Sequence, residues 1–312
     1  MTNNIIAAKG ESSALLSSNS TKAKGVNSAL LSSNNTKEKS ILLGLSLPST
    51  LIILIVILAP VLWLSSLSVL TPGGDFTGEY YTRIFSSDLY VKTFIVTFQI
   101  SISVTLFCVL LGYPLCYWIS KMPNKWAEIA MICVLVPFWT SVLVRTYAWL
   151  VLLQRNGLIN ETLLSTGLIN EPLQLAHNLT GSIIGMVHIM LPFLILPLYA
   201  SMRAIDGDLV RASISLGSSP REAFWRVFVP MSMPGLFAGV VLVFIMSLGF
   251  YVTPALLGGG KVQMLAQRIE STITFYANWG AASALGVVLL LIALAVIYAL
   301  HRTFGLDRLF MR

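Results

Sequence analysis

Charged residues are scarce in this sequence. They make up 11% of the 312 residues, whereas hydrophobic residues make up 56%, and the mean hydropathy is +0.81. The length alone would allow two soluble domains, but this composition excludes them. The chain is therefore predicted to be an integral membrane protein whose main surroundings are the lipid bilayer.

Carboxylates are missing from the middle of the long apolar runs. Glu128 is the one carboxylate within them, and it lies at the start of its run. A secondary transporter that couples to protons or sodium would need such carboxylates inside the membrane. The sequence also lacks an acidic pair or a nucleophile–base constellation near an interface, which a membrane-bound enzyme would need. We therefore expect no catalytic residues, and an ion-coupled secondary transporter is the less favoured alternative.

Cysteine and histidine are also rare. Cys108, Cys116 and Cys133 lie in apolar runs without metal-ligand spacing, so we interpret them as small buried hydrophobic residues rather than as disulfides. The three histidines are scattered singly along the chain. The sequence therefore predicts no metal site.

No nucleotide-binding motif is present. The glycine-rich stretch Gly258–Lys261 lacks the spacing of a phosphate loop, and Val262 follows the lysine. We interpret this stretch as an outward-facing turn. The chain is therefore expected to hold no cofactor, and ATP with its magnesium would have to be bound by another protein.

Six apolar runs organise the chain, each near the ~20 residues that span a bilayer. They lie at about 41–70, 93–119, 127–153, 181–203, 232–256 and 279–302. The predicted fold is thus all-α with six spans over residues 41–312. Residues 1–40 are rich in Ser, Asn and Lys and contain a repeat, Ser13–Lys22 and Ser28–Lys37, so we expect a disordered cytoplasmic tail.

The distribution of lysine and arginine predicts the orientation. With the N-terminus inside, fourteen of the 20 fall on the cytoplasmic side: Lys9, Lys22, Lys24, Lys37, Lys39, Lys121, Lys125, Arg203, Arg211, Arg221, Arg226, Arg302, Arg308 and Arg312. Five fall outside: Arg83, Lys92, Arg155, Lys261 and Arg268. The positive-inside rule then puts both termini in the cytoplasm. This topology explains the net charge of +7 without a nucleic-acid partner.

One polar stretch, residues 206–230, lies between two apolar runs inside the longer loop 204–231. Asp208 is a plausible N-cap of a first short helix, and Gly217 is placed to end it in the left-handed conformation. The pattern predicts that the chain reverses at this glycine.

A second short helix is predicted to open directly afterwards. Ser219 is its expected N-cap, Pro220 its first residue, and Glu222 completes a capping box. Two short capped helices outside the bilayer indicate a docking surface for another protein.

This elbow resembles the cytoplasmic loop of ABC-importer permeases, which reads Glu-Ala-Ala, three residues, Gly, then an apolar stretch ending in Pro. The matching residues are Ala212, Gly217, Phe224, Val227 and Pro230. The family's Glu is replaced by Arg211 and its second Ala by Ser213. The resemblance implies a coupling helix that contacts the ATPase subunit through Asp208, Arg211, Ala212, Gly217, Ser219, Glu222 and Pro230.

The run 127–153 contains one arginine, Arg145, which is costly within a span. Its guanidinium could reach the outer interface, stack on Trp149 one turn away, or bind carbonyls freed by a kink at Pro137. A structural role is favoured over contact with a transported solute.

Four further stretches resemble the permease subunits of spermidine/putrescine importers: Pro137–Trp149, Leu191–Tyr199, Pro254–Lys261 and Arg302–Leu306. The resemblance covers about residues 41–312. It implies import of a polyamine, with an opine or another small amine or amino-acid-like solute as the alternative. The tentative pathway residues are Trp139, Arg145, Tyr147, Trp149, Phe250 and Tyr251.

The resemblance also implies an assembly in the bacterial inner membrane. This chain would pair with a second homologous permease, an ABC ATPase dimer and a periplasmic solute-binding protein. The outer loops of the chain are too short to form a ligand-binding domain, which agrees with capture of the solute by another protein. Transport would proceed by alternating access.

The predicted topology can be tested with reporter fusions. Fusions at Asn170 and Asn278 are expected to report the periplasm, and a fusion at Ser218 the cytoplasm, because of the charge asymmetry. A periplasmic signal at Ser218 would overturn the six-span arrangement.

Overall fold

The computed structural model describes residues 47–71 and 73–304. The proposed tail, residues 1–40, lies outside the described residues, as do residues 41–46 of the first apolar run. Clustering of the backbone divides the chain into two units, one ending at Trp63 and the other beginning at Leu64.

The helix Leu47–Leu67 contributes the first candidate span. The remaining helices are α2 (Glu79–Ser86), α3 (Asp88–Lys121), α4 (Asn124–Trp139), α5 (Val142–Leu152), α6 (Leu158–Ser165), α7 (Leu179–Arg203), α8 (Gly207–Ser215), α9 (Pro220–Ala223), the π-helix η1 (Phe224–Phe228), α10 (Val229–Leu248), α11 (Val252–Leu257), α12 (Leu265–Thr274) and α13 (Trp279–Phe304). In the described part of the chain, extended pairing is limited to one isolated bridge, Leu70 to Phe76. The all-α fold class is thus confirmed.

Five described helices are long and apolar enough to cross a membrane, and the bent pair α4–α5 makes a sixth. The predicted span at 127–153 corresponds to this pair, and the kink considered at Pro137 is a bend of 96° between the axes of α4 and α5. Pro137 lies in the last turn of α4, and its carbonyl accepts bonds from both the backbone N–H (3.2 Å) and the hydroxyl (2.7 Å) of Thr140. Proline weakens the helical ladder and Thr140 then closes the helix end, so the chain turns there.

The fifth span also differs from its predicted bounds of 232–256. Helical structure begins at Pro220 and runs through η1 and α10 to Leu248, and α11 follows after a break at Gly249–Tyr251. The second half of the elbow is therefore the start of a long helix and not the separate short helix that we predicted.

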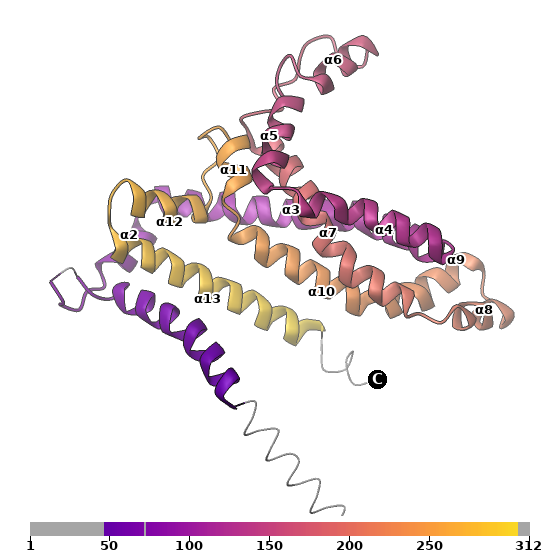
Figure 1. Cartoon of the computed structure of the whole chain (residues 1–312), viewed down its shortest axis with the longest axis horizontal. Helices are drawn as coiled ribbons and strands as arrows, with labels where there is room; N and C mark the ends of the chain where they lie inside the picture. The colour runs from indigo at the N-terminus through magenta and orange to yellow at the C-terminus, as the bar shows by residue number, and fades with distance from the viewer. Residues whose placement is uncertain (1–46, 72, 305–312) are drawn as a thin grey trace, which may run out of the picture. The chain divides into compact units, whose positions relative to one another are not determined.

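Helix α7 packs against both α3 and α10 in the unit that begins at Leu64 (Figure 1). Gly235 and Gly239 lie one turn apart on α10, where it approaches α7 most closely. A Cβ on Gly235 would lie 2.3 Å from Cβ of Ser201, and one on Gly239 would lie 2.9 Å from the carbonyl oxygen of Leu194. Small residues four apart let the two backbones come together, as in other membrane helix pairs.

Two of the three cysteines join α3 to α7. The thiols of Cys108 and Cys116 are buried and donate to the carbonyls of Val187 and Ile195, each at 3.7 Å. The expectation of a buried residue was wrong for Cys133, which is exposed on α4.

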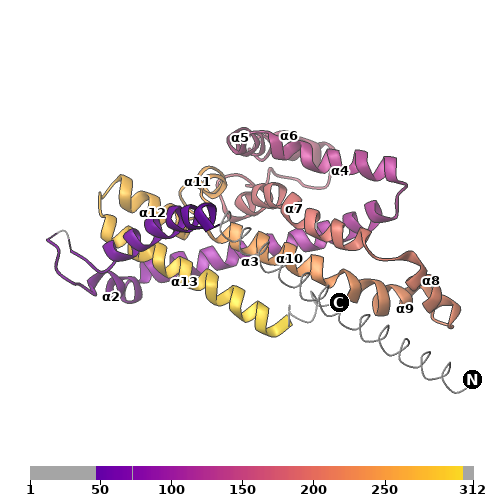
Figure 2. The same ribbon diagram turned by 60° about the horizontal axis from the view of Figure 1, so that its bottom comes forward.

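The loop helices gather at opposite ends of the α3–α7–α10 bundle. Figures 1 and 2 both place α8 and α9 beyond one end, and α2 and α12 beyond the other. The helix α6 follows α5 in the chain and precedes α7. Its buried Asn160 side chain exchanges hydrogen bonds with the backbone of Leu173, which ties α6 to the loop before α7. The predicted glycine turn is confirmed by positive φ angles of 56° at Gly259 and 75° at Gly260.

The close approach of α10 to α7 predicts opposite effects for two glycine substitutions. Gly235→Ala is expected to lower the free energy of unfolding by about 1–3 kcal/mol, because the new methyl group overlaps α7. Gly286→Ala, in α13, meets no atom within 4 Å and should raise it by about 0.5–1 kcal/mol through helix propensity alone. Denaturation of the purified variants in detergent measures both, and equal effects would contradict the packing argument.

Candidate functional site

The first helix of the elbow, α8, begins at Gly207, two residues earlier than a cap at Asp208 would place it. Its N-cap is Asp206, whose side chain accepts a 2.9 Å bond from the N–H of Asp208, so the assignment of Asp208 as the cap was wrong. Asp208 lies inside the first turn, where its carboxylate interacts favourably with the helix dipole. It also pairs with Arg211 at 3.0 Å, and both side chains are largely exposed.

Gly217 reverses the chain as predicted. Its φ angle is +98°, in the region that side chains with a Cβ disfavour. Its N–H bonds to the carbonyl of Ile214 (3.0 Å), and the N–H of Ser218 bonds to that of Ser213 (3.2 Å). This pair of bonds is a Schellman motif, which satisfies the last carbonyls of α8.

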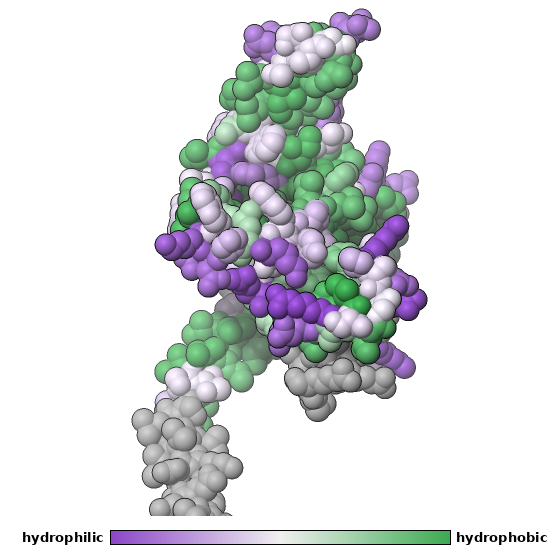
Figure 3. Space-filling model, turned by 90° about the vertical axis from the view of Figure 1, so that its right-hand side faces the viewer, coloured by the Kyte–Doolittle hydropathy of each residue, from purple (hydrophilic) through white to green (hydrophobic). Residues whose placement is uncertain are grey.

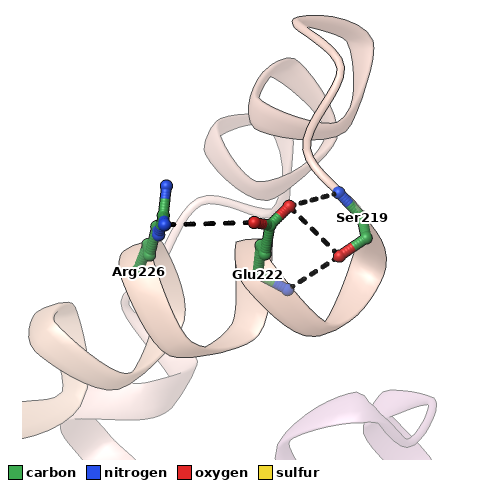
Figure 4. Close-up of polar contacts among 3 residues, drawn as sticks. All are labelled: Ser219, Glu222 and Arg226. Atoms are coloured by element: carbon green, nitrogen blue, oxygen red, sulfur yellow. Dashed lines mark hydrogen bonds and ion pairs between the residues drawn. The ribbon is translucent and has the colours of Figure 1, made fainter.

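The predicted capping box is present at the start of α9 (Figure 4). The N–H of Ser219 donates to a carboxylate oxygen of Glu222 at 3.1 Å, and the N–H of Glu222 donates to the hydroxyl of Ser219 at 3.3 Å. Arg226 lies 3.9 Å from the other oxygen of Glu222. Pro220 occupies the first helical turn, so its missing N–H leaves no gap in the ladder.

The elbow presents an exposed mixed surface. No described residue of α8 is buried, and Leu216 at its end is 88% exposed. Figure 3 looks onto this end of the molecule, and hydrophilic residues gather across it between hydrophobic regions above and below. A rigid, capped turn that exposes leucine among charged residues has the composition of a protein-binding surface.

The π-helix η1 lies directly before Pro230, the second residue of α10. A proline ring clashes with the carbonyl four residues earlier in a regular α-helix, which here is that of Arg226. The wider turn, closed by a bond from the N–H of Val229 to the carbonyl of Phe224, relieves this contact. The proline of the elbow motif therefore coincides with a change of helix type that the sequence analysis missed.

Arg145 lies in the first turn of α5 and is buried, with 8% of its surface exposed. Its Nε and Nη1 atoms have no hydrogen-bond partner in the described part of the chain. The ring of Trp149 contacts His188 at 5.7 Å. Within residues 47–71 and 73–304, Arg145 is seen neither to stack on Trp149 nor to bond a carbonyl near Pro137. Its reach to the outer interface stays a prediction.

Three residues that the sequence analysis did not single out lie in the surroundings of Arg145. The hydroxyls of Thr146 and Thr253 lie 3.0 Å apart and join α5 to α11. His188, on α7, has a buried Nδ1 without a described partner and borders a largely apolar cavity of about 520 Å³ together with Trp149. A threonine or a single histidine in an apolar run gives no sequence signal that would reveal these contacts.

The remaining tentative pathway residues lie apart on different elements. Trp139 at the end of α4 and Tyr147 on α5 are exposed, at 76% and 54%. Phe250 packs against the core around α7, and Tyr251 borders a separate cavity between α12 and the α10–α11 break. The structure thus brings Arg145 and Trp149 near His188, but does not gather these aromatic rings into one site.

Comparison with known proteins places residues 39–305 in the family of binding-protein-dependent transport system inner membrane components. The chain is 34% identical over 250 residues to the spermidine/putrescine transport system permease protein PotB of Haemophilus influenzae, covering 78% of this chain and 87% of that protein. It is 32% identical over 225 residues to PotB of Escherichia coli K12, covering 72% and 82%.

A solved structure shares the fold. It is a chain of a bacterial ABC transporter involved in the import of the acidic polysaccharide alginate, with a TM-score of 0.65 at 15% identity. The match covers 89% of this chain and 99% of that chain. The likeness supports the arrangement of the helices.

The environment of Arg145 predicts different effects for two substitutions. Arg145→Met keeps the packing of the aliphatic stem and removes a buried charge without a described partner, so the isolated subunit should melt at the same or a higher temperature. Arg145→Ala also leaves a cavity and should cost on the order of 2 kcal/mol or more. Thermal unfolding in detergent distinguishes them, and an equal loss in both variants would show that the charge itself is stabilising.

Proposed function

Since the chain belongs to the family of binding-protein-dependent transport system inner membrane components, whose model matches residues 39–305, we propose that it imports a polyamine. The chain is a multi-pass membrane protein and a translocation subunit, not an enzyme. ATP is hydrolysed in such transporters by a separate ATPase. The observation that carries the polyamine assignment is the 34% identity to PotB of H. influenzae, a spermidine/putrescine permease, over 87% of its length.

The second permease, the ATPase dimer and a periplasmic solute-binding protein are the proposed partners. Magnesium and ATP would be bound by the ATPase. The excess of lysine and arginine in alternate loops supports an inner-membrane orientation with both termini in the cytoplasm. An opine or another small amine or amino-acid-like solute is the alternative cargo.

The elbow Asp206–Pro230 is proposed to contact the ATPase. Its support is the exposed surface of α8, the left-handed reversal at Gly217, and the capping box at Ser219 and Glu222. Asp208, Arg211 and Ala212 are exposed on α8 and would form the contact together with these residues. Closure of the ATPase dimer by ATP would draw the elbows of both permeases together and switch the cavity between outward and inward access.

Arg211 stands where the resembling family has a glutamate. In this chain the guanidinium of Arg211 forms an ion pair with the carboxylate of Asp208 in the same helix, at 3.0 Å. The exposed pair presents one positive and one negative charge to a docking groove. A basic residue of the ATPase could therefore contact Asp208 in place of the missing glutamate. Because both side chains are exposed, the pair itself adds little to stability.

Transport of labelled solutes tests the proposed cargo. Vesicles that contain the whole complex, with its ATPase and binding protein, should accumulate labelled putrescine or spermidine in an ATP-dependent manner. An excess of unlabelled octopine should not compete. Uptake of octopine without uptake of either polyamine would favour the alternative cargo.

Gly217 provides the test of the elbow. Gly217→Val is expected to leave the permease in the membrane but to abolish stimulation of the ATPase by the binding protein. A Cβ in the left-handed region costs about 1 kcal/mol or more, so the turn would rearrange and misorient α8. The cost is purely conformational, because a Cβ at Gly217 would meet no atom within 4 Å.

A matched control is available within the same elbow. A Cβ at Gly207 also meets nothing within 4 Å, and its φ is not positive, so Gly207→Ala should keep the stimulation. Full stimulation with Gly217→Val would contradict the assignment of the elbow to the ATPase.

A further inference from the structure

The π-helix η1 joins the elbow to the fifth span without a break in helical structure. Ser219 caps the first turn, and helical hydrogen bonding then continues from Pro220 to Leu248 through the five residues Phe224–Phe228. A π-turn inside an α-helix contains one residue more than the regular turn, and such turns are frequent at functional sites. The angular position of α9 about the axis of α10 therefore depends on Phe224–Phe228 forming the wider turn, because the same residues in a regular α-helix would rotate α9 to another side of that axis.

Aromatic rings fix the π-turn against the cytoplasmic end of α3. The rings of Phe224 and Phe228 stack with centroids 5.8 Å apart. The ring of Tyr117, on α3, meets both edge-on at 5.1 Å. Phe228 is 2% exposed, so the contact is part of the core. Edge-to-face aromatic pairs add about 0.5–1.5 kcal/mol each beyond the area that they bury.

A cation completes this cluster. The Nζ atom of Lys121, the last residue of α3, lies 4.7 Å from the ring centroid of Phe228 and 5.7 Å from that of Tyr117. These distances lie within the range of cation–π attraction. Lys121 forms no ion pair among the described residues, so the rings are its described partners.

The same cluster touches the ends of the other elements that meet the elbow. Val210 of α8 packs against the core that contains Phe228. Arg203, the last residue of α7, donates to the carbonyl of Ser120 at 2.9 Å and also bonds the side chain of Asn124. The ends of α3 and α7, the helix α8 and the π-turn thus converge on one set of contacts directly beneath the elbow.

We propose that Tyr117 and Lys121, together with the π-turn Phe224–Phe228, are positioning residues that set the rotation of the elbow and pass its displacement to α3 and α10. The proposal rests on the proposed role of the elbow in contacting the ATPase. A push on α8 reaches the rings through Val210, and the stacked pair Phe224–Phe228 connects it to both α10 and α3. Because the cluster is packed, the elbow cannot turn without moving these spans.

Inserting one alanine between Ala223 and Phe224 tests the rotation directly. The insertion lies ahead of the π-turn, so Phe224–Phe228 and the register of α10 are kept. The elbow would then rotate by about 100° and shift by about 1.5 Å relative to the span. Stimulation of the ATPase by binding protein loaded with spermidine should fall at least tenfold, with the permease still present in the membrane.

The matched control, Trp225→Phe, keeps the length of the helix. It also keeps an aromatic ring beside that of Phe224, whose centroid lies 5.3 Å from that of Trp225. Trp225→Phe should therefore retain stimulation within about twofold of the unchanged complex. Stimulation within twofold in the insertion variant would overturn the proposal, because the rotation of the elbow about the span would then be irrelevant to coupling.

Lys121 provides an independent measurement if the insertion variant fails to fold. Lys121→Met should leave retention of the ATPase on the immobilised permease unchanged and lower the stimulation severalfold. Lys121→Arg keeps a cation over the rings and should restore it. A loss that arginine does not rescue, or no loss with methionine, would contradict the role of the cation.

The two proposals fail differently. If the elbow does not contact the ATPase, Gly217→Val keeps full stimulation. If the elbow contacts the ATPase but the cluster does not position it, Gly217→Val abolishes stimulation while the alanine insertion and Lys121→Met leave it intact. ATP hydrolysis by the whole complex in nanodiscs, together with ATPase retention, distinguishes these cases.

Discussion

The need to satisfy every backbone hydrogen bond in surroundings without water governs this structure. A helix satisfies its own backbone groups, which is why six apolar runs lead to a helical fold. The interesting positions are those where the ladder is interrupted. At Pro137 the hydroxyl of Thr140 takes part in closing the helix end, and before Pro230 a wider turn relieves the clash of the ring. Each interruption changes the direction or the rotation of the following segment.

These interruptions are useful because the bundle around them is closely packed. Gly235 and Gly239 bring α10 against α7, and the thiols of Cys108 and Cys116 connect α3 to the same helix. A packed bundle transmits a displacement instead of absorbing it. The elbow at the end of this bundle is also rigid, because caps on both sides of Gly217 satisfy its backbone groups. The molecule thus combines a stiff core with a stiff elbow, as a subunit driven by another protein requires.

Arg145 shows the opposite situation. Its buried guanidinium has two nitrogen atoms without described partners, and the nearby His188 has one. Buried polar groups in this condition are costly. The helix α5 is nevertheless held in place by its packing against α11 and α7 and by the contact between the hydroxyls of Thr146 and Thr253.

The sequence by itself determined the elements that depend on local chemistry. Apolar runs of bilayer length predicted the helices, Gly217 predicted the chain reversal, and Ser219, Pro220 and Glu222 predicted the capping box, because caps and turns are decided within a few residues. The motifs of the elbow and of Pro137–Trp149 also led to the family. Prediction from local chemistry failed where two nearby carboxylates could cap the same helix. The observed cap is Asp206, not Asp208.

Only the tertiary structure decided how the interruptions are resolved and which distant residues meet. The cluster of Tyr117, Lys121 and Phe228 depends on contacts between segments far apart in the chain. The 96° bend after Pro137 and the π-turn before Pro230 begin at local prolines, but their form is seen only in the folded chain. A proline in an apolar run predicts a disturbance of the helix, but neighbouring helices select among a kink, a break and a wider turn. Periodicity along one helix holds no information about the surface against which that helix packs.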